Sequence, residues 1–263
     1  MAYKDIGVDI AGYVATIEIR RPPHNFFDVA LINEIADALD ALGADDACRA
    51  VVLAAQGKSF CAGANFGEGS TLDAAGKRPG EAMAPIAHLY THAARLFGAK
   101  KPIVGAIHGA AVGGGLGLAL VPDFRVTCPE ARFCANFTRL GFHPGFGLTV
   151  TLPEAIGRQN AAMMFYTSRR ITGEEALRMG LADVLVPQGD VRAVAQKLAA
   201  EIAENAPLGV MATRATLRAG LAERVKAATA HELEEQSRLR KTEDFKEGVK
   251  AMAERRVPNF AGR

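Results

Sequence analysis

Two glycine-rich stretches hold the residues best suited to chemistry. KSFCAGANFGEG (58–69) follows the apolar run AVVLAA, and GAAVGGGLGLAL (109–120) follows PIVGAI. Glycines that open a helix leave first-turn N–H groups without partners and let a substrate approach the backbone closely. Two such N–H groups aimed at one point form an oxyanion hole, which stabilises a carbonyl oxygen as it gains negative charge. The alternative for both stretches is close packing of a helix on a strand. The glycine spacing does not match a dinucleotide fingerprint.

His143 is the main candidate for proton transfer. It lies in ARFCANFTRLGFHPGFGLT (131–149), just before Pro144. An imidazole changes protonation near neutral pH and therefore suits general acid or base catalysis. Its alternative role is to stabilise a turn through a backbone hydrogen bond. Weaker acid–base candidates are Glu68, Glu154 and His108, whose ordinary roles are solvation, helix-dipole complementation and packing.

Metal and disulfide chemistry are not expected. His88 and His92 lie one helical turn apart, but no third ligand accompanies them. The four cysteines form neither a C-x-x-C pair nor a regular framework. They are Cys48, Cys61, Cys128 and Cys134. We expect them to be buried small hydrophobic residues of a cytoplasmic protein.

Composition and charge limit the possible partners. Of the 263 residues, 49% are hydrophobic and 23% are charged, which is typical of a globular protein. A formal net charge of +2 is too small to indicate nucleic-acid binding. No window approaches the roughly 20 apolar residues of a membrane span, and the N-terminus lacks the pattern of a signal peptide. Neither nucleic acid nor a membrane is an expected partner.

Strand and helix patterns alternate along the first part of the chain. Strands are predicted at 14–19, 50–55, 102–109, 124–128 and 183–187, and helices at 28–43 and 87–98. This alternation predicts an α/β fold with largely parallel strands. The region from 191 onward predicts helices only, and 67–80 predicts a loop. We therefore expect a core over residues 1–190 and a helical region over residues 191–263.

Ordered motifs along nearly the whole chain resemble one family. The motifs are RPPHNFFD, FCAGANF, KPIVGAIHGAAVGGGLGLAL, PDFRVTCPEARF, LGFHPGFGLT, ITGEEALRMGLADVLVP and EDFKEGVKAMAERRVPNF. Their order is similar to that of the enoyl-CoA hydratase/isomerase (crotonase) superfamily. Each motif is weakly specific, whereas the ordered set is highly specific. The resemblance implies an α/β spiral of ββα turns that forms two near-perpendicular sheets. It also implies a C-terminal helical region for oligomerisation or as a lid, in a homotrimer or hexamer.

The resemblance implies a substrate and a site as well. The substrate would be an acyl-CoA thioester, and no cofactor is implied beyond the coenzyme A of the substrate. Its carbonyl oxygen would lie between the backbone N–H groups of Ala64 and Gly114. The implied substrate-binding residues are Asn25, Ala62, Gly63, Asn65, Phe66, Gly113, Phe137 and Phe142. Candidates for binding the CoA phosphates are Arg20, Arg21, Lys100 and Lys101.

Two positions depart from the family pattern. Hydratases of the superfamily carry one catalytic glutamate three residues after the middle glycine of the triplet and a second in the Pro-Glu pair of the next motif. This chain has Gly117 and Phe137 there. Water addition needs a base that activates water and an acid that protonates the α-carbon, so ordinary hydration is not expected.

Three functions stay open on these observations. The first is an atypical acyl-CoA enzyme of the family, acting as a lyase or isomerase through a thioester enolate or oxyanion. The second is a carbon–carbon bond hydrolase of β-dicarbonyl type that uses His143. The third is a catalytically silent acyl-CoA-binding protein.

Overall fold

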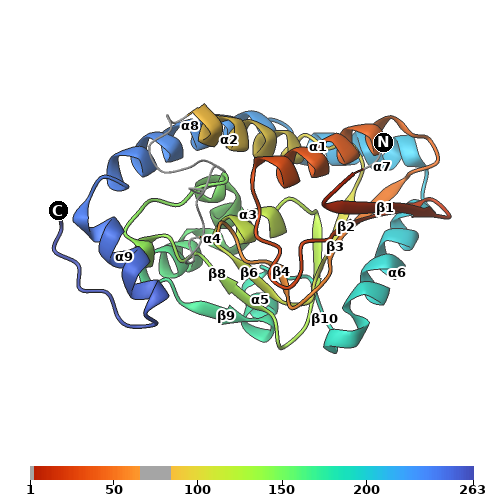
Figure 1. The fold of residues 1–263 in the computed structure, drawn as a ribbon. Helices are drawn as coiled ribbons and strands as arrows, with labels where there is room; N and C mark the ends of the chain where they lie inside the picture. The colour runs from red at the N-terminus through yellow and green to blue at the C-terminus, as the bar shows by residue number, and fades with distance from the viewer. Residues whose placement is uncertain (1–2, 66–83) are drawn as a thin grey trace.

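The strands of the chain are distributed over two sheets. The computed structural model describes residues 3–65 and 84–263 (Figure 1). The larger sheet has the strand order β1-β2-β3-β5-β7-β10. Its strands are β1 (Ile6–Ala11), β2 (Val14–Ile19), β3 (Ala50–Ala55), β5 (Ile103–Ile107), β7 (Phe124–Thr127) and β10 (Val184–Leu185). β1 pairs antiparallel with β2, and the other pairs are parallel.

The smaller sheet makes the chain a spiral. Its strands are, in order, β4 (Ser59–Cys61), β6 (Ala110–Val112), β8 (Arg132–Cys134) and β9 (Arg170–Thr172). β4, β6 and β8 each follow a strand of the larger sheet along the chain. The unit of one strand in each sheet and then a helix therefore repeats, as the ββα spiral of the resemblance predicts.

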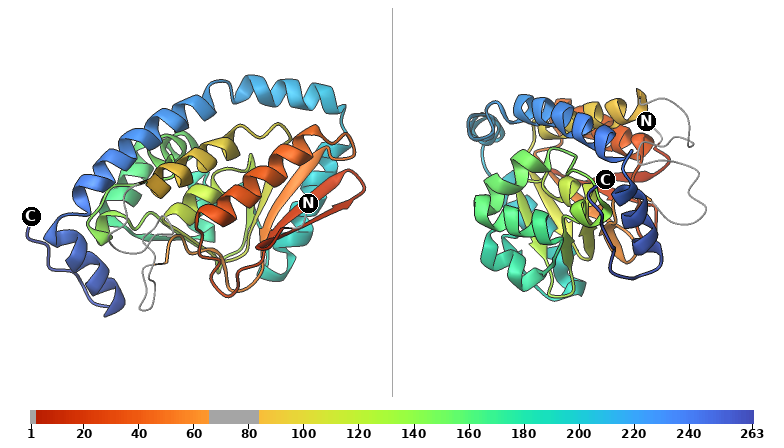
Figure 2. Two further views of the ribbon diagram at one scale, coloured as in Figure 1. Left: turned by 45° about the horizontal axis from the view of Figure 1, so that its top comes forward. Right: turned by 90° about the vertical axis from the view of Figure 1, so that its left-hand side faces the viewer.

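Helices cover the outer sides of the sheets. They are α1 (Val29–Ala44), α2 (Ala84–Phe97), α3 (Gly114–Ala119), η1 (Thr138–Leu140), α4 (Leu148–Thr167), α5 (Gly173–Met179), η2 (Gln188–Asp190), α6 (Val191–Ala203), α7 (Pro207–Leu217), α8 (Leu221–Leu239) and α9 (Glu243–Ala253). α1, α2 and α8 lie side by side along one edge of the molecule (Figures 1 and 2). After α8 the chain turns, and α9 packs against η1.

Local sequence explains several of these elements. Asp28 caps α1 by accepting a hydrogen bond from the Leu31 N–H at 2.9 Å, and buried residues then recur at helical spacing. Thr172 and Glu175 form a capping box at the start of α5. Every residue of β3 is buried, because a parallel strand between other strands is covered on both faces.

The observed elements differ from the predicted ones in three respects. The expected strands and helices are present, but β1, the smaller-sheet strands and α5 were not predicted. The helix that carries Glu154, α4, begins at Leu148, and Gly157 (φ 77°, ψ 156°) breaks its helical backbone. The charged stretch 221–256 is divided into α8 and α9. Strands of three residues are too short for a clear periodic signal, so no pattern in the sequence predicted them.

One hydrophobic core joins the sheets to the C-terminal helices. The boundary expected at residue 190 coincides with the start of α6, but α6 packs against β3, β5 and β7. Val191, Ala195 and Ala199 of α6 belong to the same buried cluster as the strands. The core therefore continues past that boundary. Among the helices of the described residues, none is long and apolar enough to cross a membrane.

Candidate active site

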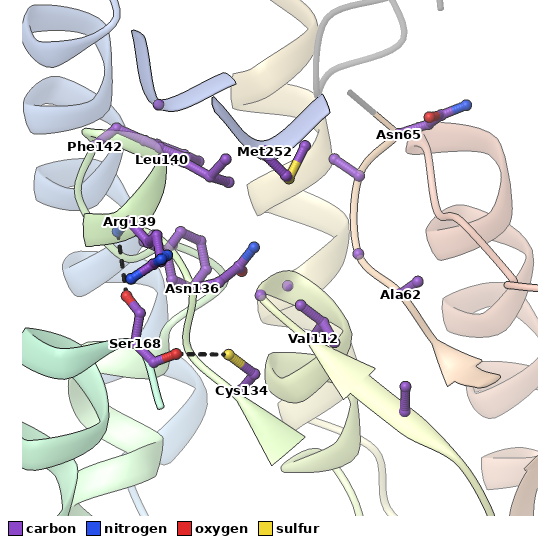
Figure 3. Close-up of a pocket in the computed structure, with 18 of the residues that line it drawn as sticks. Ala62, Asn65, Val112, Cys134, Asn136, Arg139, Leu140, Phe142, Ser168 and Met252 are labelled. Carbon is purple, nitrogen blue, oxygen red and sulfur yellow. Dashed lines mark hydrogen bonds between the residues drawn. The ribbon is translucent and has the colours of Figure 1, made fainter. Parts of the chain in front are cut away.

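A cavity of about 1230 Å³ opens at the edge of the smaller sheet. Its lining comes from β4, β6 and β8, from η1, and from α2, α8 and α9. Figure 3 shows Ala62 and Asn65 on one side and Asn136, Leu140 and Phe142 on the other. Segments far apart in the sequence therefore enclose one space.

The Gly63–Ala64 peptide presents an N–H group to this cavity. The Gly63 carbonyl accepts a hydrogen bond from the Phe27 N–H at 3.0 Å. In a trans peptide the N–H points opposite to the C=O, so the Ala64 N–H points away from Phe27. Gly63 has φ 81°, a backbone conformation that glycine adopts at no steric cost. A Cβ atom there would also lie 2.6 Å from the Val112 carbonyl oxygen.

The Gly113–Gly114 peptide supplies a second N–H group by the same logic. The Gly113 carbonyl accepts from the Leu116 N–H at 3.0 Å as α3 begins, so the Gly114 N–H points out of the helix. Gly63 lies beside it, because a Cβ atom on Gly63 would be 3.7 Å from the Gly114 nitrogen. Ala64 and Gly114 both line the cavity. Among the described residues neither N–H has a hydrogen-bond partner, so two available donors lie close together beside the cavity.

Phe146 occupies the space beside Gly117. A Cβ atom on Gly117 would lie 2.7 Å from Cδ1 and 2.8 Å from Cβ of Phe146. Phe146 is 1% exposed and has φ 64°, which is a strained conformation for a bulky residue. Its ring also packs on Phe27, with centroids 5.6 Å apart. At Gly117, where the resemblance implies a glutamate, an aromatic ring therefore fills the space.

Phe137, the second departure, faces the cavity. Its ring reaches within 3.8 Å of a Cβ atom placed on Gly113 and packs edge-on against Phe142, with centroids 5.5 Å apart. Phe142 in turn packs edge-on against Phe245 of α9. We call Phe137, Phe142 and Phe146 the aromatic wall. Within the described residues, no aspartate or glutamate lines the cavity.

The structure does not bring His143 into the cavity lining. Its Nδ1 is 2.8 Å from the Pro144 carbonyl oxygen, and its ring lies against His231 with centroids 5.9 Å apart. This local hydrogen bond is the turn-stabilising arrangement that was the alternative for His143. The His143 loop reaches the site through Phe142, Gly145 and Phe146 instead.

The remaining predicted binding residues divide into three groups. Ala62, Gly63, Asn65, Gly113, Phe137 and Phe142 line the cavity. Phe66 lies outside the described residues, as does the whole of the predicted loop 67–80, which includes Glu68. Asn25 is fully buried away from the lining, and its amide donates to the carbonyls of Gln56 and Ser59 at 2.6 and 2.7 Å. Asn25 therefore holds β4 in position.

The weaker acid–base and phosphate candidates lie elsewhere. Glu154 forms an ion pair with Arg224, and the His108 Nε2 lies 3.0 Å from the Gly57 carbonyl oxygen. Arg20 pairs with Glu18, and Arg21 pairs with Asp5 and Asp28. None of these residues lines the cavity, nor do Lys100 and Lys101. His92 is half-buried near Arg95, and the described residues contain no cluster suited to a metal ion.

Sequence reasoning missed most of the polar residues of the cavity. Seven arginines line it: Arg132, Arg139, Arg169, Arg170, Arg240, Arg255 and Arg256. His24 also lines it, with its Nδ1 3.3 Å from the Ser59 Oγ. The only sequence signals were the Arg-Arg pairs at 169–170 and 255–256, which are common on protein surfaces. Their convergence on one cavity depends on the tertiary fold.

Glu232 of α8 anchors the loop that carries the aromatic wall. Its carboxylate accepts from the Gly147 N–H at 2.8 Å, the Thr149 N–H at 3.1 Å and the Thr149 hydroxyl at 2.6 Å. These N–H groups belong to the first turn of α4, whose cap Gly147 has no side chain. Burial raises the pKa of Glu232 above its ordinary value, against the opposing effect of these hydrogen bonds.

Tyr90 and Gln236, which hydrogen-bond to each other, line the cavity itself. The Tyr90 hydroxyl donates to Gln236 Oε1 at 2.8 Å, and Gln236 Nε2 donates to the His143 carbonyl at 2.9 Å. Burial raises the pKa of the Tyr90 hydroxyl. Cys134 donates its thiol to the Ser168 carbonyl, and burial raises its pKa to about 11, so it is neutral at physiological pH. Both groups are therefore fixed and uncharged.

Strands that spiral between two sheets around an edge cavity define a crotonase-type α/β protein. The family model described as enoyl-CoA hydratase/isomerase matches residues 9–263. The chain belongs to the enoyl-CoA hydratase/isomerase family, and its relatives support an enzyme.

Individual relatives match over the full length. A probable enoyl-CoA hydratase of Rhodobacter capsulatus is 33% identical, with 100% of both chains covered. A crotonyl-CoA hydratase of Syntrophomonas wolfei is 31% identical over 99% of both chains. A crystal structure of an enoyl-CoA hydratase/isomerase from Pseudoalteromonas atlantica has a TM-score of 0.85 and 29% identity, covering 98% of this chain and 100% of that one.

Proposed function

We propose that this protein is an acyl-CoA-processing enzyme that stabilises a thioester enolate or oxyanion with two backbone N–H groups, those of Ala64 and Gly114. The observation that carries the proposal is the side-by-side position of the Gly63–Ala64 and Gly113–Gly114 peptides at the cavity edge. In each donor peptide the carbonyl oxygen accepts a main-chain hydrogen bond, which fixes the direction of the N–H on the same peptide. Neither N–H must therefore reorient when charge develops on the thioester oxygen. Preorganised donors of this kind contribute a few kcal/mol each to transition-state stabilisation.

The chemistry differs from hydration through paired glutamates. The described lining holds no carboxylate to activate water or protonate the α-carbon. The aromatic wall instead makes that side of the cavity apolar, and a water-poor cavity strengthens the field of the two N–H dipoles at the thioester oxygen. Asn136, whose Oδ1 is 3.0 Å from a Cβ placed on Gly113, is a polar side chain beside the second proposed donor. His143 is left out of the proposal because its ring does not line the cavity.

We also propose an oligomeric state and a cellular location for the protein. A homotrimer or hexamer is supported by Leu208 and Leu217, two large apolar side chains of α7 that are 78% and 81% exposed in the single chain. Light scattering of the purified protein measures the oligomeric state directly. The four free cysteines, all buried, support a cytoplasmic location.

Acetoacetyl-CoA tests the proposal whichever reaction the enzyme catalyses. Its enolate absorbs in the near ultraviolet, so a difference spectrum reports stabilisation of the thioester oxyanion independently of turnover. We expect a bound enolate at neutral pH, and turnover within a panel of enoyl-, β-keto- and aryl-thioesters. Calorimetry on the same panel measures binding.

The outcomes separate the alternatives. Binding across the panel without an enolate signal or turnover would favour a silent acyl-CoA-binding protein. Rapid hydration of crotonyl-CoA would contradict the inference drawn from Gly117 and Phe137. Carbon–carbon cleavage of a β-dicarbonyl substrate that His143→Ala abolishes, with binding unchanged, would establish the hydrolase instead.

A further inference from the structure

Four of the cavity arginines form one surface. Arg132 of β8, Arg139 of η1, and Arg169 and Arg170 at the start of β9 line the same side of the cavity, and we call them the arginine wall. All four are exposed. None of them forms a salt bridge within the part of the chain that the structure describes, whereas Arg256 across the cavity pairs with Glu247 and Glu254. The arginine wall therefore carries positive charge that no ion pair among the described residues neutralises.

The pairing of β8 with β9 explains why these side chains converge. Cys134 lies opposite Arg170 in the antiparallel pair, and Arg132 is two residues before Cys134, so all three side chains share one face of the sheet. Arg139 and Ser168 are adjacent, because the Arg139 N–H donates to the Ser168 Oγ at 3.2 Å (Figure 3). The arginine wall is thus built on strands and a helix end rather than on a free loop.

The arginine wall adjoins the proposed thioester site. The Cys134 carbonyl accepts from the Gly113 N–H at 2.8 Å, and Asn136 lies over Gly113. In coenzyme A the phosphates are separated from the sulfur by the whole pantetheine arm. Cys134, which shares a sheet face with Arg132 and Arg170, hydrogen-bonds to Gly113 of the peptide that would hold the thioester oxygen. The arginine wall is therefore better placed for an anion on the acyl side than for those phosphates.

We propose that the arginine wall binds a carboxylate at the far end of the acyl group, so that the substrate is the CoA monothioester of a dicarboxylic acid. The proposal rests on the proposed function, because it assumes a thioester carbonyl at Ala64 and Gly114. Guanidinium groups bind carboxylates through paired, charge-assisted hydrogen bonds. No carboxylate among the described lining residues competes for them.

Two ligands of equal chain length test this proposal. Adipyl-CoA ends in a carboxylate and hexanoyl-CoA in a methyl group, and calorimetry measures the Kd of each. We expect the full-length protein to bind adipyl-CoA about tenfold more tightly, as a charge-assisted hydrogen bond provides. The double variant Arg139→Gln/Arg170→Gln should lose this difference while its Kd for hexanoyl-CoA changes by less than about twofold. Arg158→Gln, an exposed arginine of α4 outside the cavity, is the matched control.

Each other result overturns the proposal in a distinguishable way. Equal weakening of both ligands in the double variant would assign the arginine wall to the CoA phosphates, and the adipyl thioester of N-acetylcysteamine, which has no phosphate, would then bind wild type and variant alike. Equal affinity of the wild type for both ligands would remove the carboxylate site but leave the proposed function intact. Binding of neither ligand would remove both. Circular dichroism confirms that the variants are folded.

Discussion

The two sides of the thioester site are built from different material. On the backbone side, the Gly63–Ala64 and Gly113–Gly114 peptides present N–H groups whose directions are set by hydrogen bonds of the main chain. On the aromatic wall, Phe137 stands at a position where the resemblance implies a carboxylate, and Phe146 fills the space beside Gly117. Because the donors are main-chain groups, the side chains used for proton transfer can be replaced while oxyanion stabilisation is retained.

The largest expected effect comes from disturbing the backbone side. Gly63→Ala would bring a Cβ atom to 2.6 Å from the Val112 carbonyl oxygen and displace the Ala64 N–H. Loss of one oxyanion donor costs about 100-fold or more in turnover, so we expect turnover to fall by a similar factor. The enolate signal of bound acetoacetyl-CoA should be lost as well.

A matched glycine separates this effect from backbone strain. Gly12 has φ 61° and no neighbour within 4 Å of an added Cβ, so Gly12→Ala has the same left-handed conformation without the collision. It should lower the free energy of unfolding by about 1 kcal/mol and leave turnover unchanged. Equal activity of the two variants would contradict the assignment of Ala64 as a donor.

A smaller effect is expected from restoring carboxylates on the other side. Phe137→Glu puts a carboxylate into the cavity next to the Gly113 peptide, and we expect crotonyl-CoA hydration to rise by roughly 10-fold to 100-fold above the wild-type rate, near the lower range of general acid–base catalysis. The loss of enoyl absorbance measures it.

Gly117→Glu should fail where Phe137→Glu succeeds. Its Cβ would lie 2.7 Å from the buried Phe146 ring, so we expect no gain in hydration and a free energy of unfolding lower by about 1–3 kcal/mol. Urea denaturation measures the stability. A hydration rate from Gly117→Glu equal to that of Phe137→Glu would show that Phe146 does not block this position.

The smallest effect concerns the anchor of the aromatic wall. Glu232→Ala leaves the buried N–H groups of Gly147 and Thr149 without their acceptor and should cost about 2 kcal/mol of stability. Glu232→Gln keeps an acceptor oxygen and should cost less.

The pH dependence of Glu232→Gln has a definite sign. Burial raises the folded-state pKa of Glu232, so the folded wild type binds more protons than the unfolded chain and loses stability as pH rises from the ordinary carboxyl pKa to the raised one. Glutamine does not titrate. In denaturant titrations, the free energy of unfolding of Glu232→Gln should therefore rise relative to wild type as pH increases above the ordinary carboxyl pKa of about 4.3. A constant or opposite difference would contradict the raised pKa.

Much of the fold could be predicted from the sequence because many of its elements have clear local patterns. The buried run of β3, the amphipathic α1 and the helices after residue 190 all have strong periodicity. The three-residue strands of the smaller sheet have none, and they form because neighbouring strands supply their hydrogen bonds. The parts of the site that lie on short strands and turns were therefore the least predictable.

The sequence by itself determined which groups the site has and which it lacks. The single glycine triplet, the ordered motifs and the residues at 117 and 137 are local facts, and through the family resemblance they predicted two backbone donors and the absence of both glutamates. Only the tertiary structure decided which side chains face the cavity. It turned the His143 ring toward Pro144 and His231, used Asn25 to hold a strand, and gathered arginines from separate elements around one space. The physical reason is that burial and direction depend on packing between segments distant along the chain, which no local pattern encodes.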